Sequence, residues 1–245
     1  MADLRNYQGR VQSGVQAGEI DQGLRSYMLK VYNLMAIGLA ITGLAAYLSF
    51  TFAVSGGQLT AFGAAIYTSP LKWVVIFAPL AMVFFLSFKI NSMSVSAAQT
   101  TFGVYAALVG LSLSSIFLIY TGQSVVQTFF VTAASFGALS LYGYTTRRDL
   151  SAMGSFLMMG LFGLIIASIV NIFLASSAMQ FAISVMGVLI FAGLTAYDTQ
   201  RIKEMYYAAD DATMAGRKAI MGALTLYLDF INLFMFLLQF MGNRK

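Results

Sequence analysis

Seven long apolar segments constrain this chain more than any other feature of its sequence. Each is about 20 residues long, which is enough to cross a bilayer as a helix. They cover residues 31–54, 71–90, 98–120, 125–144, 154–175, 179–198 and 220–240. Only 9% of the 245 residues are charged, whereas soluble domains carry about 25%. The sequence therefore predicts an all-α, polytopic membrane protein.

The basic residues predict the orientation of these segments. If the N-terminus lies inside, the inner parts of the chain hold all of the 14 Lys and Arg residues except Lys72, Arg244 and Lys245. Because cytoplasmic loops of membrane proteins are enriched in Lys and Arg, we expect a cytoplasmic N-terminus and an outer C-terminus. The net charge of +5 then reports membrane orientation, not nucleic-acid binding. Six spans with a re-entrant last segment and an inner C-terminus are the alternative topology.

The first 29 residues differ from the rest of the chain. They are polar, of mixed charge and rich in Gln and Gly, without the apolar core of a signal peptide. We expect residues 1–29 to form a mobile cytoplasmic tail that ends in a short amphipathic lead-in. Residues 30–243 then form the transmembrane domain.

The chain contains no Cys and no His. This composition excludes thiol nucleophiles, disulfides, Cys/His metal sites and His general bases. Carboxylates, Lys, Arg and hydroxyls remain, and they suggest neither a catalytic site nor a cofactor. We therefore expect a protein that is not an enzyme.

Three ionisable residues lie within or at the edge of apolar segments: Asp229, Asp198 and Lys89. At 1.5 Å per residue from Lys218, Asp229 lies about 16 Å along the seventh segment, near the bilayer midplane. An acid at this depth costs on the order of 3 kcal/mol to insert, so it should face a protein interior or a wet cavity. In the N-inside topology, Asp198 and Lys89 end the sixth and second segments on the same, inner side.

Two carboxylates that meet in a medium of low dielectric constant cannot both ionise cheaply, so Asp198 and Asp229 would share a proton. Such a pair could sense pH near neutrality without any His. When deprotonated, it would offer a weak and exchangeable site for Ca²⁺, which prefers six or more oxygen ligands. Carbonyl groups, water or Asn232 could supply some of the others.

Each of these residues also has a structural interpretation. Asp198 could be a helix-end carboxylate paired with Arg201, Asp229 a hydrogen-bonded packing residue, and Lys89 a side chain that reaches the lipid headgroups. Two acids on neighbouring spans also suggest an intramembrane aspartyl protease. However, Asp229 is not preceded by the Gly-x-Gly of that class, and the chain lacks its Pro-Ala-Leu element. An isolated Asn171 in the fifth segment predicts a hydrogen bond between helices.

Two acidic motifs identify a family resemblance. Gly193-Leu-Thr-Ala-Tyr-Asp-Thr-Gln200 and Leu224-Thr-Leu-Tyr-Leu-Asp-Phe-Ile-Asn-Leu-Phe234 are similar to motifs of the Bax inhibitor-1 family of transmembrane Bax-inhibitor-motif proteins. Tyr144-Thr-Thr-Arg-Arg-Asp-Leu-Ser151 and Asn171-Ile-Phe173 resemble its bacterial members. The resemblance covers about residues 25–243 and implies a bacterial inner-membrane location.

The resemblance also implies an architecture and a function. The seventh helix would be central, with six helices around it in two three-helix layers, and two aspartates, at Asp198 and Asp229, would gate a pH-sensitive Ca²⁺ leak. A basic residue at the inner end of the second span holds the acidic pair closed in channel-like members of this family. Lys89 is the candidate for this latch, but a Lys cannot form the bidentate bond of the family's Arg.

The leading hypothesis is therefore a pH-regulated, Ca²⁺-permeable leak channel. The channel would lie in the lipid bilayer, conduct Ca²⁺ and respond to protons. We expect a monomer that binds no nucleic acid. The resemblance also supports an alternative, because some bacterial relatives bind and restrain a membrane-bound protease. In that case the protein would act by binding another membrane protein. The polar tail has no role in the channel hypothesis but would have one in this alternative.

Overall fold

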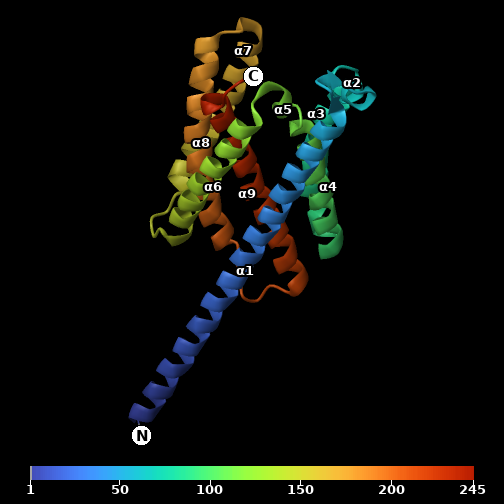
Figure 1. The fold of residues 1–245 in the computed structure, drawn as a ribbon. Helices are drawn as coiled ribbons and strands as arrows, with labels where there is room; N and C mark the ends of the chain where they lie inside the picture. Colours follow the sequence, from blue (N-terminus) through green and yellow to red (C-terminus); the bar gives the residue numbers. More distant parts are fainter. Residues whose placement is uncertain (1) are drawn as a thin grey trace.

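Long helices make up nearly all of this protein (Figure 1). The structure is a computed structural model that describes residues 2–245, with side chains from residue 21 onward. In chain order the elements are α1 (Ala2–Ala53), β1 (Val54–Ser55), β2 (Gln58–Leu59), α2 (Ala61–Tyr67), α3 (Leu71–Lys89), η1 (Ile90–Ser92), α4 (Val95–Leu113), α5 (Ile116–Ile119), α6 (Gly122–Thr145), α7 (Ser151–Leu174), α8 (Ser177–Glu204) and α9 (Ala212–Met241).

Within the described residues, seven helices are long and apolar enough to cross a membrane. They are formed by Asp21–Ala53, Leu71–Ser92, Val95–Ile119, Gly122–Thr145, Ser151–Leu174, Ser177–Glu204 and Ala212–Met241. The prediction of an all-α, polytopic membrane protein is confirmed. The structure also favours seven spans over the re-entrant alternative, because α9 is one uninterrupted helix of 30 residues.

Helix α9 occupies the centre of the bundle. It packs against α1 and α4 on one side and against α6 and α8 on the other, while α3 packs on α4 and α7 packs on α8 (Figure 1). Burial is high in the central helix and low in an outer one. In the most apolar stretch of α9, 56% of the residues are buried, compared with 11% in the most apolar stretch of α7. The outer helices therefore expose large apolar side chains, as expected where the surrounding solvent is lipid.

Short connections with defined caps join the helices. Gly56 and Gly57 have φ angles of 60° and 77° and form the two-residue turn between β1 and β2, which a side chain would strain. This hairpin and α2 occupy the Gly-rich connector between the first two spans. The side chains of Ser94, Thr121, Ser176 and Asp211 accept hydrogen bonds at the N-termini of α4, α6, α8 and α9.

Interhelical contacts show which connections share an end of the bundle. At one end, the Arg217 guanidinium donates to the Met93 carbonyl oxygen at 2.7 and 2.9 Å, and the Gln200 side chain bonds to the backbone of Arg148 and Leu150. At the other end, the Thr121 amide donates to the carbonyl oxygen of Asn243 at 3.1 Å. The two ends of α9 therefore lie at opposite ends of the bundle, as a seven-span topology requires.

The first helix begins earlier than expected. No break separates a tail from a span near residue 30, because α1 is continuous from Ala2 to Ala53. Tyr27 and Met28, which we assigned to the polar tail, are only 7% and 2% exposed. Together with Leu24 and Val31 they form a helical i, i+3, i+4, i+7 stripe, and the polar residues between them hide this stripe from a hydropathy average.

Candidate functional site

Asp198 and Asp229 meet in the interior of the bundle. Asp198 lies on α8, six residues before its C-terminal end, and Asp229 lies past the middle of α9. These two helices pack against each other, and the two carboxyl groups line the same cavity and lie close enough to interact electrostatically. An ionised carboxylate only accepts hydrogen bonds, so a hydrogen bond between these two acids requires one of them to carry a proton.

The two acids differ in their surroundings. Asp198 is half-buried, whereas Asp229 is only 5% exposed. The Oδ2 atom of Asp229 is buried and has no hydrogen-bond partner among the described residues. Such an oxygen typically costs about 1–3 kcal/mol, so its presence at the centre of the most buried helix suggests a role other than packing.

Two basic residues were candidates for contact with the acids. Arg201, one turn further along α8, places a positive charge near Asp198, but no ion pair joins the two within the part of the chain that the structure describes. Lys89 is exposed at the end of α3, which packs chiefly on α4 and α2. Its suggested role as a latch stays a prediction that these contacts do not support.

The acidic pair offers few side-chain ligands for a metal ion. Across residues 21–245 no group of three or more acidic side chains lies together, so the pair itself supplies four carboxylate oxygens at most. Asn232, the expected additional ligand, donates its side-chain amide to the Leu228 carbonyl oxygen at 2.8 Å on its own helix. The side-chain oxygen of Asn232 is not used in this bond, so it could coordinate a metal ion one turn from Asp229.

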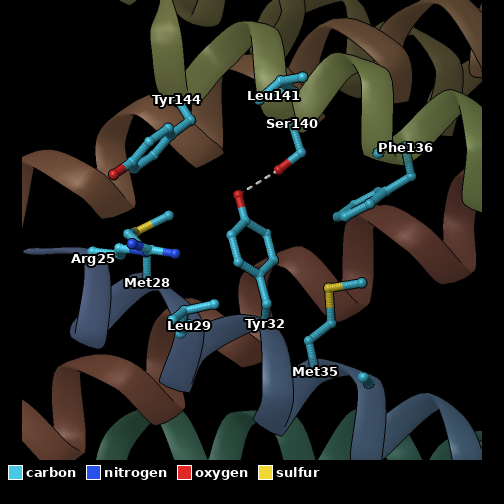
Figure 2. Close-up of a pocket in the computed structure, with 11 residues that line it drawn as sticks. Arg25, Met28, Leu29, Tyr32, Met35, Phe136, Ser140, Leu141 and Tyr144 are labelled. Carbon is cyan, nitrogen blue, oxygen red and sulfur yellow. Dashed lines mark hydrogen bonds between the residues drawn. The ribbon is translucent and has the colours of Figure 1, made fainter.

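Polar side chains that the sequence analysis did not single out connect the helices around the acids. The Tyr32 hydroxyl on α1 lies 2.7 Å from Ser140 Oγ on α6, and Ser140 lies 2.9 Å from Thr199 Oγ1 beside Asp198. This hydrogen-bonded chain crosses a cavity of about 700 Å³ between α1 and α6, where Figure 2 shows the Tyr32 ring pointing at Ser140. Among the side chains that the structure describes, Arg25 is the one charged residue that lines this cavity.

The α6–α7 connection is held close to the acids by the motif that contains Asp198. The Gln200 side chain accepts a hydrogen bond from the Leu150 amide at 2.9 Å and donates one to the Arg148 carbonyl oxygen at 2.8 Å. Lys203 Nζ donates to the Tyr144 carbonyl oxygen at 2.8 Å. In the same loop, hydrogen bonding to Ser151 lowers the pKa of Asp149, which is fully exposed, so this acid stays ionised near neutral pH.

A prediction outside the acidic motifs is confirmed. The Asn171 amide donates to Gln180 Oε1 on α8 at 3.2 Å, and Gln180 in turn donates to Gln239 Oε1 on α9 at 2.8 Å. Asn171 Oδ1 also accepts a hydrogen bond from the Ser176 amide at 3.1 Å. Asn171 therefore fastens the turn between α7 and α8 at the end of the bundle opposite Asp198.

Comparisons with known proteins agree with this architecture. Residues 24–245 match the family model described as "Inhibitor of apoptosis-promoting Bax1". The chain is 50% identical to protein RP147 of Rickettsia prowazekii over 92% of each chain. It is 46% identical to the Escherichia coli inner membrane protein YbhL, over 91% of this chain and 94% of YbhL. With seven apolar helices and matches over nearly its whole length, the chain is a multi-pass membrane protein of the Bax inhibitor-1 family.

Proposed function

We infer that this protein is a pH-regulated, Ca²⁺-permeable leak channel gated by Asp198 and Asp229. The observation that carries this proposal is the contact between two carboxyl groups on neighbouring helices within membrane-spanning segments. Acidic residues within membrane-spanning segments carry a high free-energy cost of insertion. In membrane proteins they mark ion pathways and proton relays. A hydrogen bond between them would require a shared proton, and this proton would make the helix pair sensitive to pH.

Loss of the shared proton would open the pathway. Two carboxylates about 4 Å apart repel each other by roughly 4 kcal/mol at an effective dielectric constant of about 20. Such repulsion between α8 and α9 is large compared with the few kcal/mol that separate conformational states of a protein. The closed state binds the additional proton, so a rise in pH removes that proton and favours the open state. Flux should therefore increase with pH.

Ca²⁺ entry into liposomes that contain the purified protein tests this proposal. Flux should rise between about pH 6 and 8, the range that a proton-sharing pair covers, by up to about tenfold per pH unit. Asp198→Asn and Asp229→Asn each remove one titrating group, so both variants should lose the pH dependence. An uncharged side chain facing Asp198 also removes the repulsion, so Asp229→Asn should keep a low flux at high pH.

Asp149→Asn is the matched control for these variants. Asp149 is an exposed loop acid whose Oδ1 accepts a hydrogen bond from the Ser151 amide at 2.8 Å, and Asn can replace this acceptor. The control should keep both the flux and its pH profile. Unchanged flux and an unchanged pH profile in Asp229→Asn would refute the gating mechanism, and no flux above that of empty liposomes at any pH would refute the channel.

A second candidate function rests on the N-terminal part of α1. This helix begins at Ala2, and its first turns extend beyond the other helices (Figure 1). A projecting helix could contact a membrane-bound protease or another partner and modulate its activity. Deletion of residues 2–20 separates the two functions, because a channel should still conduct Ca²⁺ while a regulator should lose its effect on turnover of the protease's substrates.

A further inference from the structure

A second cavity lies between α7, α8 and α9. It has a volume of about 560 Å³ and apolar walls that include Leu161, Leu164, Leu194 and Phe236. This volume is within the range of roughly 300–1,000 Å³ that is typical of small-molecule sites. Asp198 and Asp229 lie in its lining, so the cavity leads to the acidic pair.

The cavity opens toward the surrounding lipid. Helix α7 packs on α8 and makes little contact with α9, which leaves one side of the cavity without a helical wall. Ile165, Ile169 and Ile172 line this side and are 47%, 52% and 76% exposed. These side chains face the bilayer in a membrane-spanning helix, so a molecule dissolved in the lipid could enter without crossing water.

Apart from the acids, the polar side chains of the cavity already use a donor within their own helices. Ser168, Thr225 and Asn232 each donate to a carbonyl oxygen of their own helix, at 2.8, 3.1 and 2.8 Å. Asp229 Oδ2 differs, because it is buried at the cavity and lacks a partner among the described side chains. The cavity therefore combines apolar walls with a buried, unmet acceptor that belongs to an acidic pair.

We propose that this cavity binds a single-chain lipophilic amine, with its ammonium group at Asp229 and its alkyl chain along the walls of α7 and α9. An ammonium group supplies the donor that Asp229 Oδ2 lacks and neutralises a buried negative charge, which a neutral alcohol cannot do. A fatty acid would bring a third carboxylate to the pair and be repelled. The proposal shares the acidic pair with the proposed function but requires no ion conduction.

Photolabelling in the absence of Ca²⁺ tests the proposal. The full chain in lipid nanodiscs, with a Ca²⁺ chelator present, is labelled with dodecylamine that carries a diazirine on its chain, and the labelled peptides are mapped by mass spectrometry. Labels should concentrate on the cavity faces of α7 and α9. Unlabelled dodecylamine should compete at least about tenfold better than dodecanol, a difference of about 1.4 kcal/mol, and dodecanoate should compete least.

Variants locate the site. Ser168→Phe should fill the cavity and abolish the specific label, and Ile166→Phe is its matched control because Ile166 lies on the same helix, is 62% exposed and does not line the cavity. If Ser168→Phe does not fold, Ile169→Trp at the exposed side should block entry with less strain. Asp229→Asn should reduce the advantage of the amine over dodecanol to about twofold or less, because Asn carries no charge.

The outcomes separate this proposal from the channel. Equal competition by the amine and the alcohol, or equal labelling of the blocked and control variants, would overturn the amine site even if Ca²⁺ flux were normal. Amine-specific labelling in a protein that conducts no Ca²⁺ would support the site while refuting the channel.

Discussion

Replacement of Gly143 by Ala is expected to destabilise the bundle by about 2 kcal/mol or more. A Cβ atom at this position would lie 2.9 Å from the carbonyl carbon of Ala196 on α8, and closer still to its oxygen. These atoms belong to the Ala196 backbone, so no side-chain rotation can relieve the clash. Helices α6 and α8 would therefore have to separate. Overpacking of this kind typically costs about 1–3 kcal/mol, and close helix contacts through small residues are a main source of stability in membranes.

Gly137→Ala is the matched control on the same helix. A Cβ atom at Gly137 meets nothing within 4 Å, so the substitution should be neutral or stabilising by up to about 1 kcal/mol through helix propensity. The free energy of unfolding of both variants, measured by titration with a denaturing detergent, checks the prediction. Similar stabilities for the two variants would show that α6 and α8 do not approach as closely as described.

The same substitution should also affect the acids. Ala196 precedes Asp198 by two residues, so displacement of α8 by Gly143→Ala should shift Asp198 relative to Asp229. We expect this variant to show altered Ca²⁺ flux in the liposome assay, whereas Gly137→Ala should conduct as the parent protein does.

Replacement of Tyr227 by Ala is expected to cost about 3–5 kcal/mol, the usual range for removal of a large buried aromatic side chain. Tyr227 is fully buried on α9 and makes edge-on contacts with Phe102 and Tyr105 of α4, at centroid distances of 5.7 and 5.6 Å. Its hydroxyl also lies 2.6 Å from Thr42 Oγ1 on α1. One side chain therefore joins three helices, and Ala would leave a cavity between them.

Tyr227→Phe separates the two contributions. It keeps the ring and its aromatic contacts but removes the hydroxyl group. Thr42 stays satisfied because its hydroxyl also donates to the Ala106 carbonyl oxygen at 2.9 Å. The expected loss is therefore about 1 kcal/mol, the net value of an ordinary hydrogen bond. The same detergent titration measures both variants, and equal losses for Phe and Ala would contradict a role of the ring in packing.

Features that follow from local composition could be predicted well. Long apolar runs indicated seven spans, and an isolated Asn171 indicated the hydrogen bond that it makes to Gln180. Hydropathy missed the burial before residue 31, where polar residues interrupt the buried stripe that contains Tyr27 and Met28. Gly143 and Gly137 look alike in the sequence, although one touches a neighbouring backbone and the other meets nothing.

The sequence by itself determined that the protein is a helical membrane protein of this family, that it lacks Cys and His, and that Asp198 and Asp229 are its acids within apolar segments. Only the tertiary structure decided that these two acids line one cavity between α7, α8 and α9, and that Lys89 lies on a helix packed elsewhere. The physical reason is that hydrophobicity places a helix in the bilayer but does not select its neighbours. Neighbours are selected by close packing and hydrogen bonds between residues far apart in the chain, such as Gly143 with Ala196 and Thr42 with Tyr227.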